Sequence, residues 1–183
     1  VASRDRLTAN AFCEQLSTPC CDLTGFDANL ATIAPPPVLT LGDWRSLLNL
    51  EQVDVIAVCN LPYQHAEIVE ACLLANTHVV VEYPLALDPA SAAALLQLAR
   101  SRRRLLHVEH IELLSGVHQA LRQSLAAIGT PYQARYVTIS PKTPAPRRWS
   151  YNHQAFGFPF IGALSRVMRL VDAFGAVEAV TAT

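Results

Sequence analysis

The sequence predicts an α/β fold: a partial, doubly wound parallel sheet followed by a truncated α+β domain with a mostly antiparallel sheet. Two apolar, β-branched runs, 53–59 and 78–82, are typical of buried strands, and a helical pattern follows each. The links between these segments are short, which favours parallel strands joined by right-handed crossovers. After Gly129 the pattern changes to the period-two alternation of 132–139, which indicates a half-buried antiparallel strand.

Local signals predict where the elements begin and end. Asp88 is a suitable N-cap and Pro89 fits the first helical position after the strand 78–82, and Asp43 caps an earlier short helix. In order, we expect helix 8–17, irregular segment 18–37, short helix 43–50, strand 53–59, helix 63–75, strand 78–82, helix 89–102, strand 105–109, helix 112–127, strand 132–139, loop 141–159, helix 160–173 and strand 177–181.

Composition excludes several classes of protein. A formal net charge of -1 argues against a partner in nucleic acid or at a membrane surface. The Arg102-Arg103-Arg104 run closes a predicted helix, so compensation of the helix dipole is favoured over phosphate binding. No run approaches the ~20 apolar residues of a membrane span. The five cysteines lack CxxC spacing, which favours reduced thiols and a cytoplasmic protein.

The start of the chain, Val1-Ala2-Ser3-Arg4, resembles the end of a strand with nothing before it. We therefore expect a piece of a longer protein, with a glycine-rich βαβ start of roughly 30 residues upstream. Residues 1–115 would form a partial nucleotide-binding domain without that start. Residues 116–183 would begin a truncated C-terminal domain for substrate binding or oligomerisation, with self-association through its sheet.

The residues after this first strand bear on the choice of cofactor. In dinucleotide-binding folds, an acidic residue at this place accepts the ribose 2′-hydroxyl of NAD, whereas arginine suits the 2′-phosphate of NADP. Ser3 and Arg4 occupy the place here. We therefore expect NADP(H), with NAD(H) as the alternative cofactor and a solvated loop as the alternative interpretation.

Polar residues follow the next two strands, at the edge where open α/β sheets bind ligands. The backbone of Cys59-Asn60-Leu61-Pro62 is expected to contact the ribose and nicotinamide half of the cofactor. His65 either contacts the cofactor or caps its own helix. Glu82-Tyr83-Pro84 end the following strand, and Tyr83 is either a site residue or a packed aromatic whose hydroxyl finds a partner.

The segment His107-Val108-Glu109-His110-Ile111-Glu112 suggests a metal site at first sight. Two histidines three apart on a strand face opposite sides, and catalytic zinc usually needs three protein ligands. We therefore expect no metal, and we interpret Glu109 and Glu112 as orienting groups or hydrogen-bond acceptors. Further along, Arg166 and Arg169 lie in a largely apolar helix, where each needs a carboxylate or an anionic substrate as partner.

Several blocks together resemble a known family. Glu82-Tyr83-Pro84 resembles the Glu-Lys-Pro motif of the Gfo/Idh/MocA oxidoreductase superfamily, with tyrosine in place of lysine. Within it, the blocks 81–84, 107–114 and 156–159 followed by Ser165-Arg166 are similar to the biliverdin reductase family, and blocks 144–149 and 151–154 to its cyanobacterial members. The resemblance covers roughly 40–183 and implies a partial Rossmann domain followed by a mostly antiparallel sheet.

The resemblance implies hydride transfer from NAD(P)H to the central methine carbon of biliverdin IXα, giving bilirubin. No alcohol is deprotonated in that reaction, so a lysine base is not needed. An oxidoreductase acting on a sugar or another small carbonyl, and a non-catalytic NAD(P)-binding sensor, are the alternatives. The expected catalytic residues are Arg166, Tyr83, Glu109 and Glu112; the cofactor-binding residues Ser3, Arg4, Cys59, Asn60, Leu61, Pro62, His65, Glu82, Tyr83 and Pro84; and the substrate-binding residues Arg166, Arg169, Arg147, Arg148 and Phe158.

Overall fold

The computed structural model describes residues 40–137 and 161–181 continuously. It also describes nine further positions: Ala2, Leu7, Asn10, Ala11, Glu14, Ile139, Tyr151, Asn152 and Gln154. The chain divides into two compact units, Val1–Asp54 and Val55–Thr183, which are considered separately. The predicted segments 8–17, 18–37 and 141–159 lie wholly or mostly outside the described residues.

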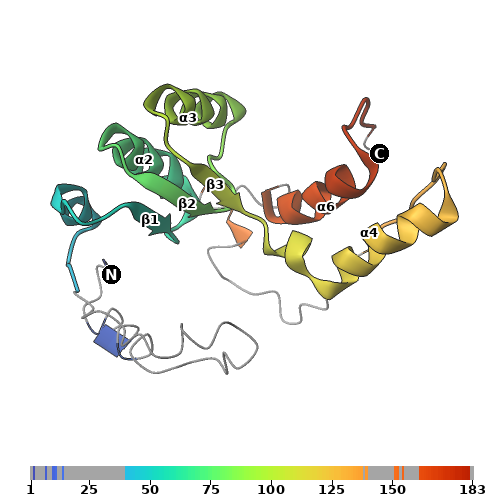
Figure 1. Cartoon of the computed structure of the whole chain (residues 1–183), viewed down its shortest axis with the longest axis horizontal. Helices are drawn as coiled ribbons and strands as arrows, with labels where there is room; N and C mark the ends of the chain where they lie inside the picture. Colours follow the sequence, from blue (N-terminus) through green and yellow to red (C-terminus); the bar gives the residue numbers. More distant parts are fainter. Residues whose placement is uncertain are drawn as a thin grey trace. The chain divides into compact units, whose positions relative to one another are not determined.

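A three-stranded parallel sheet forms the centre of the second unit (Figure 1). Its strands are β1 (Val55–Val58), β2 (His78–Glu82) and β3 (Leu106–Glu109), in the spatial order β1-β2-β3. The register pairs Val58 with Val81 and Glu82 with Glu109. The parallel sheet is as predicted, and its carboxyl ends bring residues from three separate chain segments to one edge.

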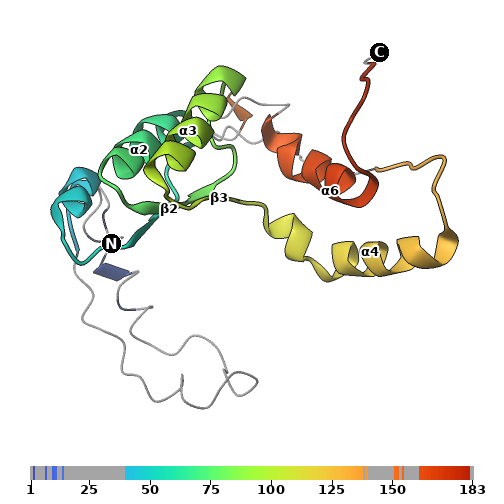
Figure 2. The same cartoon turned by 45° about the horizontal axis from the view of Figure 1, so that its top comes forward.

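Helices α2 (Pro62–Leu74) and α3 (Pro89–Arg102) lie side by side on one face of this sheet (Figures 1 and 2). Asp88 accepts a hydrogen bond from the amide of Ser91 at 2.8 Å, which confirms the predicted N-cap of α3. The core lies between α2 and the sheet, where the alternating strand residues that point to the helix are buried: Ile56, Val58, Val79 and Val81. On the opposite face, Val55 is 53% exposed, so helices of the described residues cover only one side.

After β3 the chain forms a short 3-10 helix, η2 (Ile111–Leu114), and then α4 (Gly116–Ile128). The prediction of one continuous helix over 112–127 is wrong at its start. Ser115 has an extended backbone, and its hydroxyl accepts a hydrogen bond from the amide of His118, so it ends η2 and caps α4. Further on, η4 (Ile161–Ala163) leads into α6 (Leu164–Phe174), which packs against η2 and α4.

The antiparallel C-terminal sheet that we predicted is not present among the described residues. Residues 132–137 and 175–181 adopt no strand, and Tyr132 and Val180 are 98% and 82% exposed. A strand is stable only when another strand takes up its backbone hydrogen bonds, and an isolated pair is already marginal in water. The described part of the chain offers these two segments no such partner. Self-association through that sheet therefore stays a prediction.

In the first unit, η1 (Trp44–Asn49) is a 3-10 helix, and Asp43 caps it as predicted through a hydrogen bond from Arg45 N. Ala2 forms an isolated parallel bridge with Leu41. Among the helices that the structure describes, none has both the length and the apolar character needed to cross a membrane.

Candidate functional site

The carboxyl edge of the sheet gathers the polar residues that the sequence placed at strand ends. Glu82 and Glu109 are register partners on neighbouring strands, so two carboxylates stand side by side at this edge. Cys59 and Asn60, directly after β1, are both exposed. Partial desolvation raises the pKa of the Cys59 thiol although the residue is exposed overall, and the charge of Glu82 raises this pKa further. The edge is therefore acidic and accessible, and a thiol there is held in its neutral form.

An aromatic pair follows the tips of β2 and β3. The rings of Tyr83 and His110 are stacked, with centroids 5.7 Å apart and planes inclined by 17°. Burial lowers the pKa of His110, and the nearby carboxylates of Glu109 and Glu82 only partly oppose this. Its Nδ1 is buried and has no hydrogen-bond partner among the described residues. Sequence reasoning considered His110 only as a metal ligand and missed its stacking on Tyr83.

The structure also places His65, which was expected to contact a cofactor or to cap its helix. The ring is fully buried. Its Nδ1 lies 2.7 Å from the backbone oxygen of Pro84, and its Nε2 lies 2.9 Å from the backbone oxygen of Asn60. His65 thus bridges the chain segments that leave β1 and β2. It would act on a ligand through these segments and not by direct contact.

Two of the expected site residues are partners of one another. Arg169 donates a hydrogen bond to Glu112 at 2.9 Å, and its guanidinium also lies 5.6 Å from the ring centroid of Tyr136. The side chain of Arg169 is only 11% exposed. Of the two partners considered for such an arginine, the described structure supplies the protein carboxylate. Arg166, one turn earlier, donates to the backbone oxygen of Gly162 at 3.0 Å.

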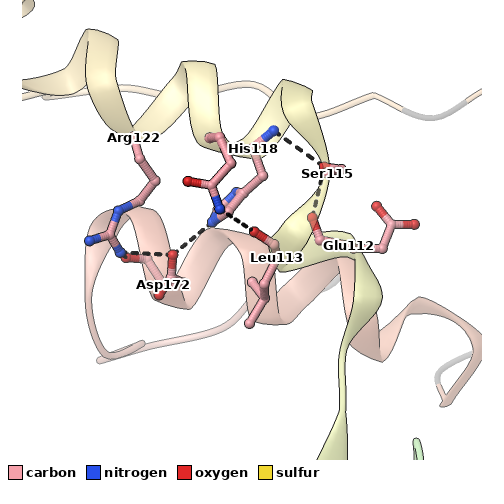
Figure 3. A network of polar contacts seen from close by, with 7 residues as sticks. Glu112, Leu113, Ser115, His118, Arg122 and Asp172 are labelled. Atoms are coloured by element: carbon pink, nitrogen blue, oxygen red, sulfur yellow. Dashed lines mark hydrogen bonds and ion pairs between the residues drawn. The ribbon is translucent and has the colours of Figure 1, made fainter. Parts of the chain in front are cut away.

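A second polar network joins α4 to α6 and was missed by sequence reasoning (Figure 3). His118 is buried, and its Nε2 lies 2.7 Å from a carboxylate oxygen of Asp172. Arg122 donates to the same oxygen at 2.8 Å. The hydrogen bonds from His118 and then from Arg122 lower the pKa of Asp172. The available signal was Asp172, the single acidic residue of the largely apolar helix 160–173.

Five expected site residues cannot be placed. The cofactor-binding candidates Ser3 and Arg4 and the substrate-binding candidates Arg147, Arg148 and Phe158 lie outside the described residues. Within the described ranges, no three His, Cys, Asp or Glu side chains are grouped as metal ligands.

The groups at the sheet edge fit one half of a nicotinamide dinucleotide. Carboxylates such as Glu82 can accept hydrogen bonds from ribose hydroxyls or from a carboxamide. Two carboxylates would repel the phosphates, and no G-x-G-x-x-G loop occurs in the sequence. The described residues therefore suit the nicotinamide half and not the diphosphate.

Comparisons with known proteins agree with this architecture. The chain is 35% identical to mouse biliverdin reductase A (Mus musculus) over 136 residues, which is 74% of this chain and 43% of the relative, and 31% identical to the human protein (Homo sapiens) over the same shares. It is 51% identical to biliverdin reductase from Synechocystis sp. PCC 6803, in a crystal structure with biliverdin and NADP+. That match has a TM-score of 0.71 and covers 76% of this chain and 44% of the other.

The chain thus spans less than half the length of these relatives. A family model described as an oxidoreductase family with an NAD-binding Rossmann fold matches residues 1–110. That match covers more than half of the sequence and includes all three strands of the sheet. The chain belongs to the Gfo/Idh/MocA oxidoreductase family.

Proposed function

We propose that the chain is part of a biliverdin reductase, which reduces biliverdin IXα to bilirubin with NADPH as the preferred reductant. The observation that carries the proposal is the 51% identity, over 76% of this chain, to a biliverdin reductase whose crystal structure holds biliverdin and NADP+. NADH is the alternative reductant. In this proposal residues 1–115 belong to the nucleotide-binding domain, and residues 116–183 begin the domain that contacts the bilin.

The bound nicotinamide would supply a hydride, and the product also requires one proton on a pyrrole nitrogen. Tyr83 is consistent with this chemistry, because no alcohol is deprotonated in the reaction. A lysine base at this position, as in the Glu-Lys-Pro motif, would have no proton to remove from the substrate. The flat pair of Tyr83 and His110 offers an aromatic surface at the strand tips, which suits a conjugated ligand.

Arg166 is our candidate for stabilising charge on the bilin or for delivering the proton through a water molecule. Its guanidinium has five N–H donors, and within the described structure one contact, to Gly162, is made. A direct role as an acid is disfavoured, because an arginine guanidinium keeps its proton in proteins. Glu82, Glu109 and Glu112 would position the two ligands, although Glu112 does so while it is paired with Arg169.

The test is made on the gene product that contains this sequence. Mixing it with NADPH and biliverdin should convert the green pigment to a yellow one, followed by absorbance. Unchanged spectra at saturating NADPH would refute the proposal. Arg166→Ala should lower kcat, whereas Arg100→Ala, an exposed arginine in the last turn of α3, serves as the matched control and should leave it unaltered.

A further inference from the structure

His65 stands at an unusual place for a polar residue. It belongs to the buried stripe of α2, whose members recur at helical spacing. The side chain of His65 is as completely buried as the aliphatic residues that follow it. The members of the stripe are Pro62, His65, Ile68, Val69, Cys72 and Leu73. An apolar side chain would satisfy packing alone, so the imidazole must be explained by what its nitrogens do.

Both ring nitrogens point to backbone oxygens in different segments. Pro84 O, beyond the end of β2, lies 2.7 Å from Nδ1, and Asn60 O, beyond the end of β1, lies 2.9 Å from Nε2. A carbonyl oxygen only accepts hydrogen bonds, so the ring donates through whichever nitrogen carries a proton, and the other nitrogen stays in close contact with its oxygen. The contacts tie two neighbouring turns to one rigid ring.

The first of these turns has little else to fix it. Leu61, the N-cap of α2, makes no side-chain capping bond, and the helix begins at once with Pro62, which has no amide proton to donate. Within this turn the structure has one backbone hydrogen bond, from Gln64 N to Leu61 O at 2.8 Å. The oxygen of Asn60 is therefore held from inside the fold by His65.

We propose that His65 is a positioning residue for the cofactor. It fixes the turn after β1 relative to the turn after β2, and so sets the spacing between Asn60 and the Glu82-Tyr83 pair at the ligand-binding edge. The proposal rests on the NAD(P)-binding part of the proposed function and is independent of which substrate is reduced. Small displacements of such groups are costly, because binding contacts depend on distances of a fraction of an ångström.

The test compares two histidine substitutions on the same gene product. His65→Phe keeps an aromatic ring but removes both ring nitrogens and their contacts with the two oxygens. His78→Phe is the matched control, because His78 lies at the opposite end of β2 and also bonds to the backbone, accepting from Leu105 N at 2.8 Å. Two quantities are measured without any bilin: the Kd for NADPH by fluorescence titration, and amide hydrogen exchange in peptides covering 59–63 and 83–87.

We expect His65→Phe to weaken NADPH binding on the order of tenfold and to speed exchange in both peptides. We expect His65→Gln, whose amide retains two N–H donors, to recover part of both effects. The control should change the Kd by less than about twofold. If His65→Phe does not fold, His65→Asn replaces it, since its amide is too short to span both oxygens, with the same expected result.

Exchange that stays unchanged in the two peptides, or that rises equally throughout the chain, would overturn the proposal. The exchange readout needs no ligand, so it decides the role of His65 even if the protein proves not to bind NADPH. Tight NADPH binding without bilin reduction would count against the proposed substrate alone. If His65→Phe and the His78→Phe control changed the Kd for NADPH equally, general destabilisation of the protein would explain the change. That result would overturn the proposal as well.

Discussion

The ion pair between Arg169 and Glu112 allows a quantitative test of how α6 is attached to η2. The two charges are 2.9 Å apart, and their side chains are 11% and 32% exposed. We consider Glu112→Gln, Arg169→Met and the double variant. Each single change removes one charge, and the double-mutant cycle isolates the interaction between the two residues.

The magnitude follows from distance and burial. At 2.9 Å and an effective dielectric constant of about 20, the direct attraction is roughly 6 kcal/mol. Desolvation of a nearly buried guanidinium offsets most of it. Exposed pairs retain about 0–1 kcal/mol, and removal of one partner from a fully buried pair costs about 3–5 kcal/mol. The intermediate burial here leads us to expect a coupling of about 1–2 kcal/mol.

Burial also predicts an asymmetry between the single variants. Glu112→Gln leaves the less exposed charge, Arg169, without its carboxylate, whereas Arg169→Met leaves Glu112 in partial contact with water. We therefore expect Glu112→Gln to cost more free energy of unfolding, about 2–3 kcal/mol against about 1–2 kcal/mol. Urea unfolding of the four proteins measures both quantities, with Arg166→Met as a control from the same helix.

Two results would refute this reasoning. A coupling below about 0.3 kcal/mol would show that the pair does not attach α6, and a larger cost for Arg169→Met would show that burial does not control the balance. The same variants bear on substrate binding. If Arg169 binds a propionate of the substrate, Arg169→Met should raise the KM for biliverdin beyond any effect of Glu112→Gln.

Further predictions concern the core, the pH dependence and the strand edge. Leu73→Ala should cost about 3 kcal/mol of unfolding free energy in a urea titration, because the side chain of Leu73 is fully buried. The neighbouring Leu74 is 48% exposed, so Leu74→Ala should cost less than about 1 kcal/mol in the same titration. Hydrogen bonds lower the pKa of Asp172, so its contribution to stability is present above pH 3.8 and is lost as the pH falls through the lower folded-state pKa. Asp172→Asn should therefore flatten the acidic part of a plot of unfolding free energy against pH. A plot for the variant that runs parallel to that of the unaltered protein would contradict this. Desolvation and then the charge of Glu82 raise the pKa of Cys59. Glu82→Gln should therefore increase the thiolate fraction at neutral pH and speed alkylation of Cys59 by iodoacetamide, as measured by peptide mass spectrometry. An unchanged rate would exclude the electrostatic contribution of Glu82.

The elements that could be predicted are those whose signal is local. The strand 78–82 and the cap at Asp88 agree with the structure, because β-branched runs and capping side chains act within a few residues. The break at Ser115 was missed, although serine is a common N-cap residue and its hydroxyl accepts from His118 N. A capping serine can divide a helical pattern that periodicity alone presents as one helix.

The C-terminal strands failed for a different reason. Alternation in 132–139 records which side chains prefer burial, but a strand also requires a neighbour for its backbone, and the pattern does not contain one. The position of the candidate-site residues was predicted where it depends on strand ends, as with Glu82 and Glu109 at the edge of the sheet. It was missed where it depends on packing between segments, as in the buried contacts of His65 and the Tyr83–His110 stack.

The two polar networks on α6 have one more consequence, which concerns the direction of that helix. Along α6 a cation comes first, Arg169, and an anion follows, Asp172; along the facing segment an anion comes first, Glu112, and the cation Arg122 follows. With α6 reversed end to end, Arg169 would meet Arg122 and Asp172 would meet Glu112, so both contacts would become repulsive. The order of charges thus specifies which way α6 runs, information that an apolar contact of the same area would not contain.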